Sequence, residues 1–260
     1  ATVAFIVTLL IVSEQIHRFL INAFASDAYP ILEDVTNRHI LARHIGVDAA
    51  SCLLVSYFGF KNRHILGELM TLRRDTEGCH RRIYTYQPAG HQVLLYFLAF
   101  QVKNMYDTIK WNDGVVFVLH HIFAGLTAWF GMYPGVASMY GLFFMGYSEI
   151  STGILCLLAN FDPDLGVAGL DEIFPITRLV LGAMFVVSFI IVRIIIWPLL
   201  TYHFLGDVRA ILKRDSEMET KAVKFALKAM MTSSVALTIL QVVWLGEVIM
   251  TAKKEISNLL

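Results

Sequence analysis

The sequence predicts an all-α polytopic membrane protein of about seven transmembrane helices around a polar chamber. Hydrophobic residues make up 57% of its 260 residues and charged residues only 16%, and its mean hydropathy is +0.62. Soluble domains rarely combine these values. Apolar runs recur along the chain, and each approaches the roughly 20 residues that a helix needs to cross hydrocarbon. No long polar block could fold separately, so a single membrane domain is expected.

Turn residues divide these apolar runs into seven segments. Short connections are expected at Trp111 to Gly114 and at Gly131 to Gly135, and Asp162-Pro163-Asp164 interrupts the chain after the fifth run. The fourth and fifth segments should therefore form a tight antiparallel hairpin. The predicted segments are residues 2–24, 40–60, 91–111, 114–132, 135–160, 176–204 and 228–251. The longest link is 61–90, and 209–228 is expected to be a charged, partly helical surface segment.

Charge and cysteine content exclude several classes of protein. The formal net charge is zero, and no basic run suggests binding to nucleic acid. Cys52 and Cys156 lie in apolar runs and Cys79 lies in a link, which is unlike a disulfide framework or a cysteine metal site. The chain begins at Ala1 within an apolar run, from which a truncated or processed start is expected. The oligomeric state is left open.

Ionisable residues within the predicted membrane segments point to a site. Such residues are expensive in hydrocarbon unless they face a partner or a wet cavity. With a rise of about 1.5 Å per residue, Asp107 and His120 fall at similar shallow-to-middle depths, and Glu149 lies near the middle of the membrane. His44 enters the membrane from the face that we name side A, which has the links at residues 25–39, 111–114 and 161–175. Most of these residues fall in the half of the bilayer at side A. The opposite half, side B, is nearly featureless, so a polar chamber open to side A is expected.

Two adjacent histidines, His120 and His121, interrupt the fourth segment. Adjacent helical residues point about 100° apart, so the two rings would not share one metal ion, and no metal site is predicted. Imidazole titrates near neutrality and can act as a general base or a nucleophile, with Asp107 or Glu149 stabilising its cation. A structural hydrogen bond between helices is the alternative.

One cation and three glycines stand out in the later segments. Arg193 interrupts the run Phe189 to Val192 and cannot easily reach the membrane surface, so it either neutralises an internal acid or binds an anionic headgroup. The residues leave both readings open. Three glycines of the fifth segment are expected to permit close helix packing, namely Gly141, Gly146 and Gly153.

These motifs together resemble the TLC domain, the membrane fold of ceramide synthases, translocon-associated proteins and several lipid-regulating proteins. The resemblance covers nearly the whole chain from about Asn37. The short proteins that consist of a TLC domain alone are the most similar in outline. The resemblance is carried by Asn37-Arg38 with His44, Tyr106-Asp107, Phe117 to His121, Ser148 to Thr152, the block from Phe189 to Pro198 with Arg193, and Trp244.

The resemblance implies a TLC-type bundle and a candidate site. It divides the chain into a first helix and link at 1–36, a TLC domain at 37–255 and a tail at 256–260. In ceramide synthases the histidine pair belongs to a site that transfers an acyl group from acyl-CoA to a sphingoid amine. By resemblance, the catalytic residues would be His120, His121, Asp107 and Glu149, and the ligand-binding residues would be Asn37, Arg38, His44, Ser151, Thr152 and Arg193.

The resemblance also implies a setting for this activity. No cofactor is expected, acyl-CoA would be a substrate, and the partners would be membrane lipid and the bilayer. The expected location is the endoplasmic reticulum or another endomembrane. The basic residues of the links at 61–90 and 209–228 would place side B in the cytosol, whereas the resemblance implies that the chamber, on side A, opens to the cytosol.

One departure from the ceramide synthases bears on the function. Those enzymes continue from the histidine pair into a run that ends in His-Asp-x-Ser-Asp, whereas this chain has Gly146 to Ser151 at the comparable distance, with Glu149 as its only acid. This argues against ceramide synthesis itself. Three expectations remain open: another lipid acyl transfer, a non-catalytic lipid-binding protein that regulates membrane lipid composition, or, as in some TLC relatives, a helper of other membrane proteins, for which no feature of the sequence argues.

Overall fold

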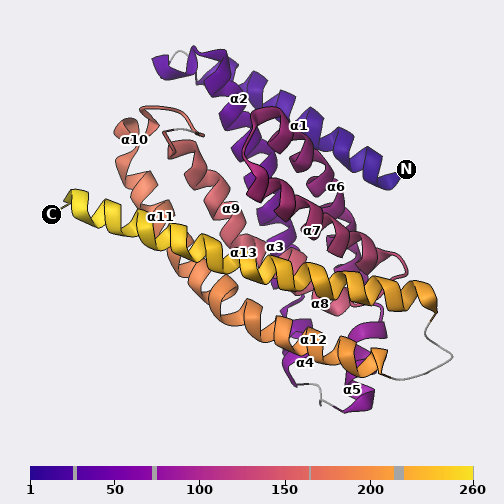
Figure 1. Cartoon of the computed structure of the whole chain (residues 1–260). Helices are drawn as coiled ribbons and strands as arrows, with labels where there is room; N and C mark the ends of the chain where they lie inside the picture. Colours follow the sequence, from indigo (N-terminus) through magenta and orange to yellow (C-terminus); the bar gives the residue numbers. More distant parts are fainter. Residues whose placement is uncertain (26–27, 72–74, 164, 214–219, 260) are drawn as a thin grey trace.

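A computed structural model describes residues 1–25, 28–71, 75–163, 165–213 and 220–259, with side chains to Lys254. Most of the described residues are helical, with no strand among them, in agreement with the all-α prediction. Figure 1 shows an elongated bundle in which the long helix α13 crosses the face nearest the viewer. The first half of the chain forms α1 Thr2–Phe24, η1 Pro30–Leu32, α2 Val35–Arg43, η2 His44–Ala49, α3 Ala50–Lys61, α4 Arg63–Thr71, α5 Thr76–Tyr84, α6 Pro88–Trp111 and α7 Val115–Met132.

The second half of the chain is helical in the same way. Its elements are α8 Ser138–Leu142, η3 Phe143–Tyr147, α9 Glu149–Leu158, η4 Ala159–Phe161, α10 Leu170–Ile173, α11 Pro175–Phe189, η5 Ile190–Ile196, α12 Trp197–Leu212 and α13 Lys221–Leu259. Three elements, η2, η3 and η5, are π-helical turns within longer helices. The residues 214–219 of the predicted surface segment lie outside the described residues.

Six stretches of the described chain are long and apolar enough to cross a membrane. They are 2–24, 35–61, 115–132, 138–161, 175–212 and 221–254. The remaining predicted segment, 91–111, is helical as α6 but is not among the six. Its buried Gln101, Lys103 and Asp107 lower its hydropathy, and α1, α3, α7 and α8 pack around it. A helix covered by other helices can carry polar side chains that lipid would not tolerate.

The link at 61–90, for which the sequence analysis predicted no secondary structure, is largely helical. It forms α4 and α5, which pack against α8 and α12 respectively. Asp75 begins α5 as its N-cap, where its carboxylate accepts a hydrogen bond from the Gly78 amide at 2.9 Å, a standard way of satisfying the first amides of a helix. This link therefore closes one end of the bundle.

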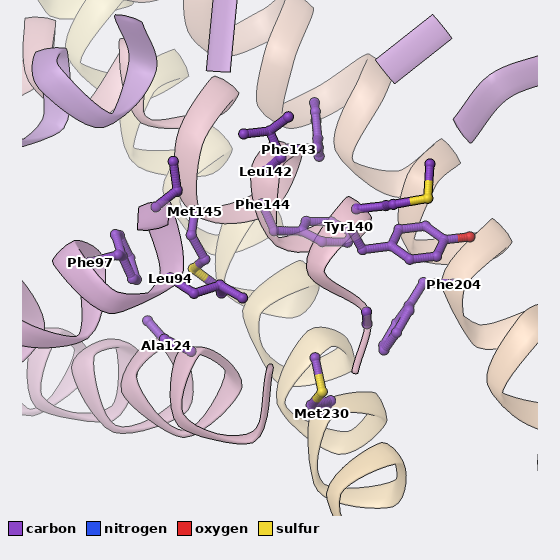
Figure 2. Packing of buried hydrophobic residues seen from close by; sticks show 14 of the residues in the cluster. Leu94, Phe97, Ala124, Tyr140, Leu142, Phe143, Phe144, Met145, Phe204 and Met230 are labelled. Atoms are coloured by element: carbon purple, nitrogen blue, oxygen red, sulfur yellow. The ribbon is translucent and has the colours of Figure 1, made fainter. Parts of the chain in front are cut away.

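An aromatic core fills the bundle near this end. Figure 2 shows Tyr140, Phe144 and Phe204 close together, and the ring centroids of Tyr140 and Phe204 lie 5.1 Å apart. Leu94 of α6 lies under the glycine-containing α8, because a Cβ at Gly141 would come within 2.9 Å of its side chain. Gly146 and Gly153 are crowded in the same way by α3, which confirms the predicted packing role of these glycines.

The opposite end of the bundle gathers the links that defined side A. Leu32, Leu41, Val167 and Leu170 form one buried cluster, which brings the links at 25–39 and 161–175 together. The turn at Asn112 has a left-handed backbone with φ of 56°, and the following Asp113 pairs with Arg43. Side A is therefore a real end of the bundle, as the segment order predicted.

Candidate functional site

Arg193 is the hub of a buried network between η5 and α9. Its Nη2 donates to Glu149 Oε1 and to Thr152 Oγ1, both at 2.7 Å, and its Nε donates to Ser151 Oγ at 3.1 Å. The guanidinium also lies 5.0 Å from the ring centroid of Trp197. Of the two readings that the sequence left open, the structure shows the first: Arg193 neutralises an internal acid.

The π-helical turn explains how Arg193 reaches its partners. An extra residue in a turn widens the helix and shifts the side chains that follow, and such turns are frequent at functional sites. Arg193 lies within η5 and is only 4% exposed. Glu149 begins α9, separated from η3 only by Ser148, so both members of the ion pair lie in or close to π-helical turns.

The histidine pair on α7 makes its hydrogen-bond and ring contacts with uncharged groups. His121 is buried, and its Nδ1 lies 2.7 Å from Gln101 Oε1 on α6. Because an amide oxygen can only accept, this contact places the proton of the neutral ring on Nδ1 and leaves the lone pair on Nε2. The ring of His120 packs against Trp244 of α13, with centroids 5.1 Å apart, and against His121 at 5.3 Å. The buried Nδ1 of His120 has no hydrogen-bond partner among the described residues.

The two predicted carboxylates lie with cations rather than with the imidazoles. Asp107 forms an ion pair with Lys103, which also donates to Glu14 Oε2 of α1 at 2.6 Å. Glu149 is held by Arg193 as described above. Within the described ranges, no hydrogen bond joins either carboxylate to His120 or His121. The structure therefore places these four residues in three neighbouring networks.

A further network lies at side A around η2. Arg43 Nη2 donates to Asp113 Oδ2 at 2.5 Å, and its Nε lies 3.5 Å from Asp48 Oδ2. His44 is buried beside them, and its Nδ1 lacks a hydrogen bond of ordinary geometry to any described residue. Asp48 was not singled out from the sequence, although a carboxylate within the run from Ile45 to Val55 was a usable signal.

These networks are close enough to influence one another. Asp48 interacts electrostatically with Arg43, Asp107 and Lys103, and the thiol of Cys52 donates to Glu149 Oε2 at 3.6 Å. Arg193 in turn interacts with His120. The polar residues of separate helices therefore form one band through the bundle, which is the gathering expected from their depths.

Two predicted ligand-binding residues have backbone partners. Asn37 Nδ2 donates to the carbonyl of Ile31 at 2.8 Å, and Arg38 Nη1 donates to the carbonyls of Leu32 and Glu33 at 2.8 and 2.9 Å. These bonds fix η1 against the start of α2. The structure therefore does not bring Asn37 and Arg38 to the histidine pair.

Side B has a charged cluster that the sequence analysis missed. Arg82 of α5 donates from Nε and Nη2 to the two oxygens of Asp207 at 2.6 and 2.8 Å, and Tyr140 donates to the same carboxylate at 2.7 Å. These hydrogen bonds raise the pKa of Arg82. Asp207 was not singled out, because the sixth segment was expected to end at residue 204, whereas α12 continues to Leu212.

The described residues contain no group of three or more His, Cys, Asp or Glu side chains placed to hold a metal ion. A hollow lies elsewhere, between α3, α4 and η3, lined largely by apolar residues such as Leu66, Leu69 and Phe143. The polar band itself is therefore the candidate site.

A comparison with known families agrees with this arrangement. The family model described as TRAM_LAG1_CLN8, TLC domain, matches residues 44–250, a range that includes the histidine pair, Asp107, Glu149 and Arg193. No curated protein and no solved structure matches the chain. A family match over most of the chain, on a bundle of apolar helices with this polar band, identifies the protein as a member of the TLC-domain family.

Proposed function

We propose that this protein acts on membrane lipids at His120 and His121, and that its reaction is the transfer of an acyl group from acyl-CoA to a lipid amine or hydroxyl. The observation that carries the proposal is the contact of His121 Nδ1 with Gln101. It leaves Nε2 with the lone pair that a general base or a nucleophile needs. The polar band supplies charges around the pair, while α6 and α13 pack against the helix that carries it.

In the proposed reaction His121 transfers a proton from the acceptor to the leaving group. As the acceptor attacks the thioester carbonyl, a bond from carbon to nitrogen or oxygen forms and the bond from carbon to sulfur breaks. Imidazole Nε2 takes the proton of the acceptor and returns it to the departing thiolate. General-base catalysis contributes about 100-fold to 10,000-fold. The proposed location of this reaction is the endoplasmic reticulum or another endomembrane. A sphingoid amine is the first acceptor to test.

The test compares three purified proteins in lipid nanodiscs: the wild type, His121→Ala and His64→Ala. Labelled acyl-CoA is supplied with long-chain amines and alcohols, and acylated product is measured. His64 is an exposed histidine of α4, so its substitution controls for the general loss of an imidazole. We expect His121→Ala to lower product formation by about 100-fold or more and His64→Ala to match the wild type. Equal product from all three proteins would refute catalysis by this pair.

A non-catalytic role as a lipid-binding regulator of membrane composition is the second candidate. One observation favours it: Asp107 and Glu149 are engaged by Lys103 and Arg193, and hydrogen-bonded acids of this kind do not orient an imidazole. Mass spectrometry of lipid copurified under mild extraction tests this role. A bound lipid that is retained by the wild type and lost in His121→Ala, without turnover, would support it. Extraction without any enriched lipid would count against it.

A further inference from the structure

Gln241 of α13 is a buried amide without a partner. Its side chain is 2% exposed, and neither its oxygen nor its nitrogen forms a hydrogen bond with any described residue. Buried amides are almost always hydrogen-bonded, and an unmade bond is more costly where water is scarce. A membrane helix could hold leucine here at no such cost. The unsatisfied amide therefore indicates that something else completes it.

A second unsatisfied group lies close by on α7. Gln241 precedes Trp244 by three residues, which places them on adjacent turns of one helix face, about 4.5 Å apart along the axis. The ring of Trp244 packs on His120, whose buried Nδ1 also lacks a partner among the described residues. Two polar groups thus remain unpaired on either side of Trp244, the residue of α13 that packs on His120 of α7.

The charges nearby limit what could fill this interface. Arg193, the cation that interacts with His120, is already paired with Glu149 at 2.7 Å. A charged headgroup would add an unbalanced charge in a buried place, which is strongly unfavourable. A carboxamide offers both donors and an acceptor, so the complementary ligand group is neutral and has both functions as well. A hydroxyl and an amide meet this requirement.

The position of α13 suggests where the rest of such a ligand would lie. This helix packs on α7 and α12, whereas Val242 and Ile239, on its other side, are 65% and 59% exposed. In Figure 1 it crosses the outside of the bundle. A molecule bound between α7 and α13 could therefore keep its apolar chain in the bilayer. We propose that Gln241 and His120 bind the hydroxyl or amide group of a neutral lipid at this interface. This inference rests on the proposed lipid function for its location and adds the ligand class.

Photolabelling tests the inference with three matched probes. Each has the same long alkyl chain with a diazirine, and the head is a primary alcohol, a primary amide or a methyl ether, which cannot donate. The full protein in nanodiscs is irradiated with each probe, and labelled peptides are identified by mass spectrometry. We expect the alcohol, the amide or both to label α7 and α13 at least tenfold more than the ether does. Whichever probe exceeds the ether identifies the ligand chemistry. Equal labelling by all three would overturn the proposal.

Variants show whether the preference depends on Gln241. Gln241→Leu should abolish the preference over the ether, whereas Ser234→Ala, a change at another buried polar position on α13, should retain it. Gln241→Leu removes the unsatisfied amide and should fold at least as well as the wild type. Should it fail to fold, Gln241→Asn decides, because its shorter amide should reduce the preference. An unchanged preference in the variant measured would refute the proposal and leave Gln241 as a buried amide, satisfied at most by water.

The inference and the proposed function can fail separately. If no acceptor is acylated and no lipid copurifies, but the wild type prefers the alcohol or amide probe and Gln241→Leu does not, the proposed function is wrong and the ligand site stands. If acylation depends on His121 while Gln241→Leu keeps the preference of the wild type, the proposed function stands and this inference is wrong.

Discussion

At the scale of single residues, Arg193 illustrates how a membrane helix retains a charge. Its side chain cannot reach water. Its charge is therefore stabilised by hydrogen bonds to Glu149, Ser151 and Thr152, which come from a different helix. The sequence predicted that this cation was special and suggested an acid as one possible partner. It could not choose between an acid and a lipid headgroup, because depth along a helix can be counted but the direction of a side chain around the axis cannot.

Breaking this ion pair on one side should be costly. Arg193→Leu leaves Glu149 buried without its partner and should lower the free energy of unfolding by about 3–5 kcal/mol. The double variant with Glu149→Gln should recover much of that loss, because no charge then remains unpaired. Unfolding in a mixture of detergent and denaturant measures the stability of the single and the double variant. A double variant that is no more stable than Arg193→Leu would contradict this account.

Gln101 is the residue that fixes the tautomer of His121, and it escaped the sequence analysis because a neutral amide in an apolar helix resembles a packing residue. Gln101→Leu removes the acceptor and should cost about 1–3 kcal/mol of stability, since the Nδ1 proton of His121 is left buried and unpaired. If His121 is catalytic, turnover should fall as well. Gln101→Glu, which restores an acceptor, should recover turnover. Thermal unfolding and the acylation assay measure these effects.

At the scale of elements, the helices were largely predictable and their irregularities were not. Long apolar runs and the turn at Asn112 gave most boundaries, although α6 begins at Pro88 rather than at residue 91. The π-helical turns have no sequence signature, since they depend on contacts with other helices. No helix was predicted within the link at 61–90 either, because α4 and α5 are short helices that pack on α8 and α12.

Close approach between α3 and η3 gives a prediction at this scale. A Cβ at Gly59 would lie 2.6 Å from the backbone nitrogen of Tyr147, whereas a Cβ at Gly182 of α11 would meet nothing within 4 Å. Gly59→Ala should therefore destabilise the protein by about 1–3 kcal/mol, as overpacking does. Gly182→Ala should be neutral or stabilising, because alanine favours a helix. Thermal unfolding of the two variants compares them directly, and similar shifts in both would contradict the close contact.

At the scale of the whole molecule, an ion pair stands at each end of the bundle. Arg43 joins α2 to the turn after α6 at side A, and Arg82 joins α5 to α12 at side B. The candidate site lies in the polar band between these two pairs. The members of the band around Arg43 belong to side A itself. The seven predicted segments located side A correctly, but a buried pair at side B was not foreseen, because Arg82 lies in the link at 61–90, outside the predicted membrane segments.

The pair at side B should hold the 61–90 link in place. Asp207→Asn removes the charge that accepts from Arg82 and Tyr140, and should lower stability by about 3–5 kcal/mol and speed proteolysis of the link. Asp171→Asn is the matched control, because Asp171 and Arg178 are half-exposed and 3.9 Å apart, and such surface pairs contribute at most about 1 kcal/mol. Equal proteolysis of both variants would show that the pair does not secure the link.

The pKa of Arg82 sets how this stabilisation depends on pH. Its hydrogen bonds to Asp207 raise that pKa above the usual value, so the folded state holds the proton more tightly than the unfolded state does. The contribution is fully present below the ordinary arginine pKa and is lost only as the pH rises above it. We therefore expect Arg82 itself to introduce no change in unfolding temperature between about pH 6 and pH 10.

The length of α13 has a mechanical consequence. Its 39 residues amount to about 58 Å at 1.5 Å per residue, nearly twice the thickness of a hydrocarbon core of about 30 Å. A helix of this length must tilt steeply or project into the headgroup layer, and its tilt depends on the thickness of the surrounding bilayer. Trp244 and Gln241 belong to this helix, so a thicker or thinner membrane would alter their position relative to α7.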